Sequence, residues 1–298
     1  MTVVPVLEVG GTHVTAARVD TARWAVPRGS TIRSNLDSGG EIQDIVAALA
    51  GAGRRAHPRP VRRWGVAVPA PFDYEAGVAW FSDVGKFDSL HGLDLRVALR
   101  HVLSSAEVHF VNDAEAITTG QWLSGAARGA RRALGVTRGT GVGSAWLVNG
   151  VAVQEGPGVA PGGRLDLLEV DGSPLEHLVS RRAMLAPYAQ LAGDDAPVAD
   201  AVDLAEWARG GNSAVAARAL HEAMRALGAV LAPRGAAFEA DVIVVGGSVA
   251  LSSDLVVPPL AAAVDDVAAL TGCTVRLVPA QTGVDGALIG AAREAVSH

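Results

Sequence analysis

The chain has 298 residues, of which 49% are apolar and 19% are charged, and its formal net charge is −6. This composition is typical of a soluble globular protein and excludes intrinsic disorder, and the length predicts two lobes of roughly 100–200 residues each. Acidic and basic residues are scattered, so we expect no nucleic-acid partner. The sequence shows no run of about 18 apolar residues and no signal-peptide pattern, so we expect a cytoplasmic protein without a membrane span.

Two residue types are unusually rare. Cys273 is the one cysteine, which excludes an internal disulfide and a Cys-rich zinc cluster. The chain also has 24 arginines but one lysine, Lys86. An ammonium group is a compact point charge that a guanidinium does not replace, so Lys86 is a candidate functional residue. The alternative is that Lys86 has no function and is a lysine retained by chance on a solvent-exposed loop.

Hydrophobic periodicity and turn residues predict an alternation of strands and helices. In chain order we expect strands at 3–9 and 13–19, a helix at 41–56, a strand at 63–68, a loop at 71–90, a helix at 94–104, a strand at 107–111, a helix at 113–130, strands at 133–138 and 144–149, one or two helices within 200–232, a strand at 241–245, a helix at 253–270, a strand at 274–279 and a closing helix at 284–296. The alternation predicts an α/β fold with a mixed sheet in each lobe.

Three glycine-rich turns follow predicted strands. They are Gly10-Gly11-Thr12, Gly139–Gly143 and Gly246-Gly247-Ser248. Glycine lets backbone N–H groups approach phosphate oxygens closely, and Thr or Ser adds a hydroxyl donor. One such turn is usually only a hairpin, but three spread over the chain favour one bound nucleotide. None matches the P-loop or the dinucleotide-binding pattern.

A carboxylate lies at the junction between a predicted strand and a predicted helix. Asp113 follows Val111 and Asn112 at the end of the strand. In that position it can take the proton from a substrate hydroxyl as the oxygen attacks phosphorus. The alternative is that Asp113 is simply the cap of the helix that follows.

These segments resemble, in the same order, the motifs of the ROK family of sugar kinases. LEVGGTHVTAARVD resembles the first phosphate motif, which usually reads DxGGT, and GVAVPAPFDYEAGV resembles the GxxxPGPxD…GxV segment. VNDAEA resembles the NDAN motif with its catalytic Asp, TRGTGVGSAWLVNG the second phosphate motif, and VIVVGGSVA the adenosine motif. Together they cover nearly the whole chain.

The resemblance implies two actin-like (RNase H-like) α/β lobes with ATP and Mg²⁺ in the cleft between them. The N-terminal lobe would comprise residues 1–111 with the closing helix 284–298, and the C-terminal lobe residues 112–283. Asp113 would be the catalytic base. The nucleotide-binding residues would be Gly10, Gly11, Thr12, Thr140, Gly141, Gly246 and Gly247.

The departures from the family pattern are also informative. Glu8 replaces the Asp of the first motif, and its longer carboxylate would reach Mg²⁺ through a water. The ExGH segment and the Cys-rich zinc motif are absent, so we expect no zinc and no usual hexose contacts. The chain is similar to a zinc-free subgroup through residues 71–74, 86–92 and 180–182. The candidate substrate-binding residues are Asn112, Lys86, Asp88, Arg164, Asp166 and Glu176.

The sequence therefore predicts ATP-dependent phosphorylation of a hydroxyl on a sugar or sugar-like polyol, with glucose a poor substrate. Two alternatives stay open: a cyclitol kinase of secondary metabolism, and a degenerate ROK protein that binds ligand without turnover. A ROK repressor would carry a DNA-binding domain ahead of the Gly-Gly-Thr motif, and we expect none here because that motif begins at residue 10. Whether the chain forms a homodimer is also open.

Overall fold

The structure is a computed structural model that describes residues 3–138, 141–170, 172–179, 185, 214–247, 253–272, 274–283 and 285–298. The chain divides into two compact units. One comprises Met1–Ser124 with Val284–His298, and the other comprises Gly125–Gly283. Each unit contains one five-stranded sheet.

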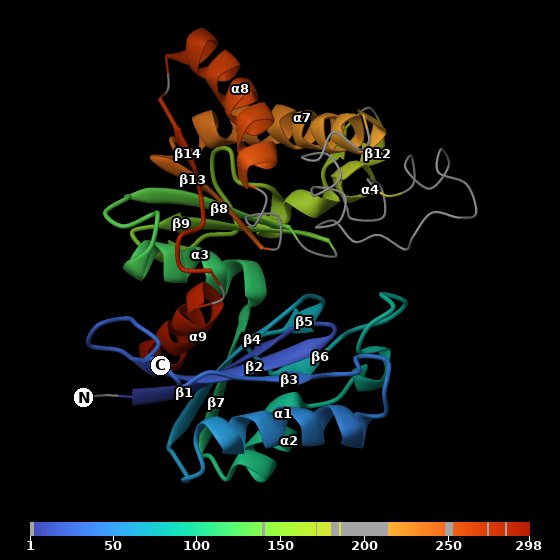
Figure 1. Cartoon of the computed structure of the whole chain (residues 1–298), viewed down its shortest axis with the longest axis vertical. Coiled ribbons are helices and arrows are strands. Elements are labelled where there is room, and N and C mark those ends of the chain that lie inside the picture. Colours follow the sequence, from blue (N-terminus) through green and yellow to red (C-terminus); the bar gives the residue numbers. More distant parts are fainter. Residues whose placement is uncertain are drawn as a thin grey trace. The chain divides into compact units, whose positions relative to one another are not determined.

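The first unit is built on a mixed sheet in the order β3-β2-β1-β4-β7 (Figure 1). Its strands are β1 (Val3–Val9), β2 (His13–Asp20), β3 (Ile32–Asn35), β4 (Arg63–Val68) and β7 (Glu107–Asn112), and a small hairpin adds β5 (Phe72–Asp73) and β6 (Val78–Ala79). Its helices are α1 (Ile42–Ala56), α2 (Leu95–Leu103), α3 (Asp113–Ser124) and α9 (Asp285–Ser297), with a 3₁₀ turn at Asp88–Leu90. Strands β1, β4 and β7 run parallel, so their carboxyl ends share one edge of the sheet.

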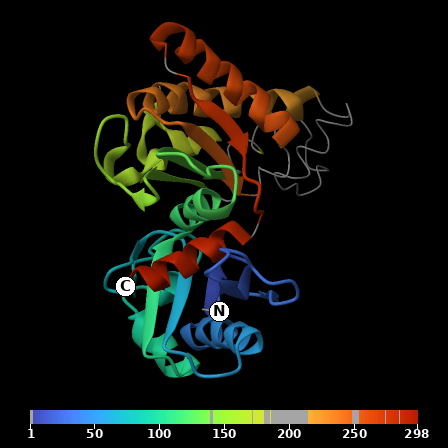
Figure 2. The same cartoon turned by 90° about the vertical axis from the view of Figure 1, so that its left-hand side faces the viewer.

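Helices cover both faces of this sheet. Alternate residues of a strand point to opposite faces, so Leu7 packs with α1 and α2 while Val6 packs with α3 and α9. Figure 2 shows α9 lying across its face of the sheet. Glu8 shares the parity of Val6, so its side chain points to the face that α3 and α9 cover.

Helix α9 approaches its neighbours at backbone distance. A Cβ added at Gly290 would lie 2.0 Å from the Ala116 carbonyl oxygen of α3, and one at Gly65 would lie 2.0 Å from the Ala291 carbonyl oxygen. Real Cβ atoms essentially never come within 3.0 Å of another heavy atom. Glycine at these positions therefore lets α9 pack in backbone contact with both β4 and α3, the helix that begins at Asp113.

The second unit repeats the plan with a sheet in the order β10-β9-β8-β13-β14. Its strands are β8 (Arg132–Arg138), β9 (Val142–Val148), β10 (Val151–Ala152), β13 (Val242–Gly247) and β14 (Arg276–Pro279), with a short pair β11 (Glu169–Val170) and β12 (Ser173–Pro174). Helices α4 (Leu175–Val179), α7 (Ala214–Ala237) and α8 (Ser253–Thr271) share one core with β8, β9 and β13. Two 3₁₀ turns, Pro161–Gly163 and Leu165–Leu167, follow β10.

The expected α/β class with a mixed sheet in each half is confirmed. One helix is shorter than expected: the segment 113–130 stops being helical at Ser124, and turns closed by Gly125 and Ala127 carbonyls follow. Contacts group α3 with the first unit because it packs on α9, so this division falls after Ser124 and not after residue 111. The boundary of a functional lobe stays a prediction.

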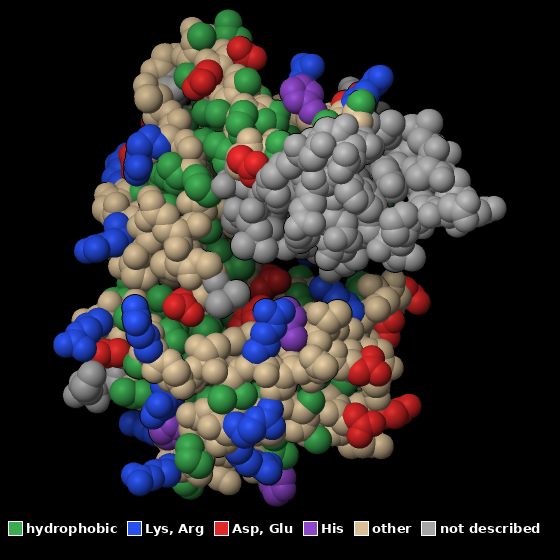
Figure 3. All heavy atoms as spheres, viewed as in Figure 1, with side chains coloured by type: hydrophobic (Ala, Val, Ile, Leu, Met, Phe, Trp, Pro, Cys, Tyr) green, Lys and Arg blue, Asp and Glu red, His purple; other side chains and the backbone are tan. Residues whose placement is uncertain are grey.

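Two properties of the described part of the chain bear on partners. No helix in it is long and apolar enough to cross a membrane. On the face drawn in Figure 3, Lys and Arg side chains lie scattered among acidic ones.

Candidate active site

The first glycine turn joins β1 to β2. The Gly10 N–H donates to the His13 carbonyl oxygen at 2.9 Å, and His13 Nε2 lies 3.9 Å from Glu8 Oε2. Glu8 faces Thr15 across the antiparallel pair, and the Thr15 hydroxyl donates to its carboxylate. The turn and the Glu8 carboxylate are thus held together at the carboxyl end of β1.

Asn112 and Asp113 lie where β7 passes into α3. Asn112 Oδ1 accepts from the Ala114 N–H at 3.0 Å and the Glu115 N–H at 3.3 Å, which is the bonding pattern of a helix cap. Its Nδ2 donates to the Tyr74 hydroxyl at 2.9 Å. Asp113 Oδ1 shares the Ala114 N–H at 2.9 Å. Asn112 therefore caps α3, and the helix start does not depend on the Asp113 carboxylate alone.

Glu8, Asn112 and Asp113 come to the same edge because of the strand register. Glu8 pairs with Ala67 of β4, and Val68 of β4 pairs with Asn112 of β7. The carboxyl ends of parallel strands are where open α/β sheets bind their ligands. The structure thus brings together the predicted metal residue and the predicted base.

Lys86 reaches the same place from a different loop. A Cβ on Gly11 would lie 3.8 Å from Lys86 Cδ, so the lysine stem runs beside the first glycine turn. Its charge also acts on Asp113. The next residue, Phe87, is buried against Phe81 with ring centroids 5.2 Å apart, which fixes the loop. These contacts favour a functional Lys86 over one left by chance on a solvent loop.

Burial dominates the electrostatics of the two carboxylates. It raises the pKa of Asp113 above its usual 3.8, and the Lys86 ammonium opposes that rise. Burial likewise raises the pKa of Glu8. The hydrogen bond from Thr15 opposes that rise, and repulsion from the Asp113 charge adds to it. A general base is most effective when its pKa approaches the working pH, so the direction of the Asp113 shift suits proton abstraction.

The second glycine turn lies in the other unit. Gly141 is described, whereas Thr140 lies outside the described residues. A Cβ on Gly141 would lie 2.5 Å from Glu176 Oε1, so the Glu176 carboxylate lies directly against this turn. Sequence reasoning assigned these two residues to different ligands, and the structure makes them neighbours.

The third glycine turn is explained by packing. Gly247 has φ +79°, and a Cβ there would lie 2.4 Å from the carbonyl oxygen of Arg138 on the neighbouring strand. Gly246 pairs with Thr137 in the same register.

Arg138 is a buried charged residue that sequence reasoning missed. Its Nε donates to the Val179 carbonyl oxygen at 2.5 Å, and burial lowers its pKa to about 10.

The remaining predicted substrate residues have these surroundings. Arg164 and Asp166 form an ion pair with each other, with Arg164 Nε 2.8 Å from Asp166 Oδ1. Asp88 is exposed, and its Oδ1 accepts from the Val84 N–H at 3.3 Å. Sequence reasoning also missed Tyr74, which holds Asn112, although the PFDY segment contained it.

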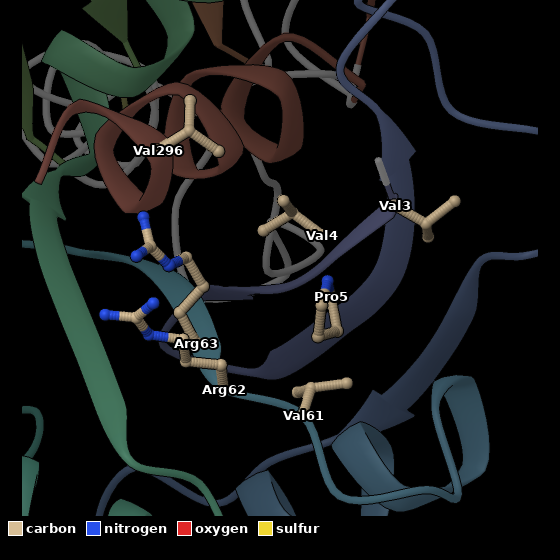
Figure 4. A pocket seen from close by; sticks show the side chains of 7 residues that line it. All are labelled: Val3, Val4, Pro5, Val61, Arg62, Arg63 and Val296. Carbon is tan, nitrogen blue, oxygen red and sulfur yellow. The ribbon is translucent and has the colours of Figure 1, made fainter. Parts of the chain in front are cut away.

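A hollow of about 450 Å³ lies at the opposite edge of the first sheet. Valines and Pro5 line it at the starts of β1 and β4 and the end of α9, together with Arg62 and Arg63 (Figure 4). Both arginines are paired with Glu107, at 3.0 and 3.2 Å. Because it faces away from the edge that carries Glu8 and Asn112, this hollow is separate from the candidate site.

The model of the ROK family matches residues 5–296. The chain belongs to the ROK family. No curated protein matches it significantly.

Solved ROK structures share this fold. The chain is 26% identical to a ROK hexokinase from Thermus thermophilus, with 99% of this chain and 98% of that one covered and a TM-score of 0.79. It is 22% identical to a ROK family glucokinase from Streptomyces griseus, solved with glucose and AMPPNP, with full coverage of both chains and a TM-score of 0.81. A ROK family transcriptional regulator, a homologue of the Escherichia coli MLC protein, is 17% identical, with 97% and 78% covered and a TM-score of 0.76. The expected actin-like fold is confirmed.

The zinc-free ROK subgroup stays a prediction. Within the described ranges, no three His, Cys, Asp or Glu side chains lie close enough together to hold a metal ion. Residues 180–182, which carried part of that resemblance, lie outside those ranges, and so does Cys273.

Proposed function

We propose that this ROK protein is an ATP-dependent kinase that phosphorylates a hydroxyl of a sugar or sugar-like polyol in the cytoplasm. One observation carries the proposal. Asn112 supplies the cap of α3, so the half-buried Asp113 carboxylate beside it is available as a base, next to Lys86 and the first glycine turn.

The chemistry follows from these positions. Asp113 takes the proton of the acceptor hydroxyl as its oxygen bonds to the γ-phosphorus, and the bond from that phosphorus to the bridging oxygen of ADP breaks. Backbone N–H groups of the turns at Gly10–Thr12 and Gly141 bind phosphate oxygens. Lys86 adds a fixed positive charge near the transferred group.

Glu8 is the residue that would hold Mg²⁺. Its carboxylate oxygens suit a hard cation, and its repulsion with Asp113 is what a divalent charge would relieve. When bound, Mg²⁺ offsets phosphate charge during transfer. Asp88, Arg164, Asp166 and Glu176 remain proposed contacts to the acceptor.

The test is ADP release from ATP and Mg²⁺ with a panel of hexoses, amino sugars and cyclitols. Turnover of at least one sugar or polyol supports the proposal, and a cyclitol as the best acceptor would narrow the substrate class. No ADP release with any member contradicts it.

A second candidate is a ROK protein that binds sugar and nucleotide without turnover. Burial raises the pKa of Glu8, which disfavours the ionised carboxylate that would hold Mg²⁺, and this favours the second candidate. Calorimetric binding of a sugar with no ADP release would select this function over the first.

A further inference from the structure

The loop that carries Lys86 also presents an aromatic side chain that no motif accounts for. The Trp80 side chain is 49% exposed, whereas Trp64 and Trp146 are 1% and 0% exposed in the cores of the two units. The indole meets the His91 ring edge-on, with centroids 5.5 Å apart and planes at 72°. An indole that is half exposed gains little from the hydrophobic effect on folding, and its apolar face is accessible to a ligand.

Hydrogen bonds hold the backbone around Trp80 and His91. The backbone N–H of Trp80 donates to the Pro71 carbonyl at 3.2 Å, and the backbone N–H of Gly92 donates to the Ala79 carbonyl at 2.8 Å. His91 Nδ1 lies 2.9 Å from the Phe81 carbonyl oxygen. These bonds hold the backbone at Trp80 and the ring of His91, and the edge-on contact places the indole against that ring.

His91 adds a polar group of defined character. A carbonyl oxygen can only accept, so the proton of this bond belongs to His91 Nδ1. In the neutral ring, Nε2 is then a hydrogen-bond acceptor. The exposed pair therefore offers a flat apolar surface with an acceptor at its edge.

The pair lies on the same loop as Lys86 and is joined to the candidate site through packed neighbours. Phe81 and Phe87 pack together, and Trp80 precedes the first of them while Lys86 precedes the second. Lys86 in turn runs beside Gly11 and acts on Asp113. Pro71, which holds Trp80, follows the carboxyl end of β4, beside Asn112 on β7.

We propose that Trp80 and His91 form a binding subsite for the ring of the acceptor, whose C–H face stacks on the indole while one hydroxyl donates to His91 Nε2. A sugar or cyclitol ring has both features, an apolar C–H face and hydroxyls around its rim. Aromatic side chains with a few placed polar groups are the usual lining of small-molecule sites. The subsite rests on the proposed function for the identity of its ligand.

Binding without ATP tests the subsite independently of catalysis. The probes are glucose, mannose, fructose, N-acetylglucosamine and myo-inositol, each titrated while tryptophan fluorescence is recorded. At least one probe should change the fluorescence of the wild type, and this change should be lost in Trp80→Phe. If no probe changes it, or if the change persists in Trp80→Phe, the subsite is wrong.

Steady-state kinetics with the best acceptor gives the second readout. Trp80→Ala should raise the acceptor KM about tenfold while kcat and the KM for ATP stay within about twofold, and Trp80→Phe should keep most of the affinity. His91→Ala should raise the acceptor KM as well. The control is Val97→Ala, which trims a 58% exposed apolar side chain on α2 and should change nothing.

The outcomes separate the two proposals. Turnover that Trp80→Ala leaves unchanged contradicts the subsite and leaves the kinase standing. A Trp80-dependent fluorescence change without ADP release contradicts the kinase and supports the subsite. A raised KM for ATP alone would mean that the indole stacks on adenine, which also contradicts the subsite as proposed.

Discussion

Asp113→Asn tests whether the carboxylate serves catalysis or the start of α3. The variant keeps an oxygen at Oδ1 that can accept from the Ala114 N–H, now bonded at 2.9 Å, and Asn112 still accepts from Ala114 and Glu115. Because burial raises the Asp113 pKa, ionisation costs folding stability as the pH rises above the unfolded pKa, and the neutral amide avoids that cost. We expect a free energy of unfolding within about 1 kcal/mol of wild type, or higher. Phosphoryl transfer should fall by about 10²-fold or more.

The assay pairs ADP release with urea unfolding at pH 7, and nucleotide binding measured by titration should be retained. Asn112→Ala is the matched control for stability, since it removes both cap bonds and should cost about 0.5–2 kcal/mol. An Asp113→Asn protein that turns over within a few-fold of wild type would refute the assignment of the base.

Other predictions follow from single features. Lys86→Met should lower kcat/KM for the acceptor at least tenfold by removing the positive charge beside the base; unchanged kinetics would place Lys86 outside the site. Burial raises the pKa of Glu115 to about 7, so its ionisation should lower the free energy of unfolding as the pH rises from about 4.5 to 7. Urea unfolding across that range should show a smaller dependence of stability on pH in Glu115→Gln than in the wild type. An equal dependence in both proteins would contradict the burial of Glu115. Gly290→Ala should destabilise the protein by about 1–3 kcal/mol, since its Cβ would meet a backbone oxygen at 2.0 Å. The control Gly51→Ala in α1, whose Cβ would lie 3.6 Å from an Arg side chain, should stabilise it by up to about 1 kcal/mol. Thermal unfolding of both variants measures this, and equal changes in melting temperature would refute the close packing at Gly290. Elemental analysis of the purified protein should find no stoichiometric zinc, and one zinc per chain would contradict the prediction that this protein belongs to a zinc-free subgroup.

The fold could be predicted from the sequence because its signals are local. The strands expected at 3–9 and 63–68 have those bounds in the structure, since each is a short β-rich run that a turn or a proline ends. The end of α3 was missed because an Ala-rich segment keeps helical propensity beyond Ser124, while the turn at Gly125 depends on bonds made there.

The site could be predicted only in part because pairing between side chains is not local. Sequence alone could place Asp113 at a strand end, but not show that Asn112 takes the cap. It treated Lys86 as a substrate contact, and only the folded loop shows that its charge acts on Asp113 and its stem runs beside Gly11. Similarly, the pairing of Arg164 with Asp166 and the contact of Glu176 with Gly141 need the tertiary structure.

The fold itself does not decide between a kinase and a binding protein. A ROK hexokinase and a ROK transcriptional regulator match this chain with TM-scores of 0.79 and 0.76, so the same backbone supports both. The difference must lie in whether a carboxylate is positioned to accept a proton. Here Asn112 accepts two N–H groups at the start of α3 and Asp113 shares one of them, so the helix start does not depend on the Asp113 carboxylate alone, although burial disfavours its charge. A half-buried carboxylate retained at that cost, beside the single lysine and a glycine turn, is better explained by chemistry than by folding, which is why Asp113→Asn is the variant that tests the proposed function most directly.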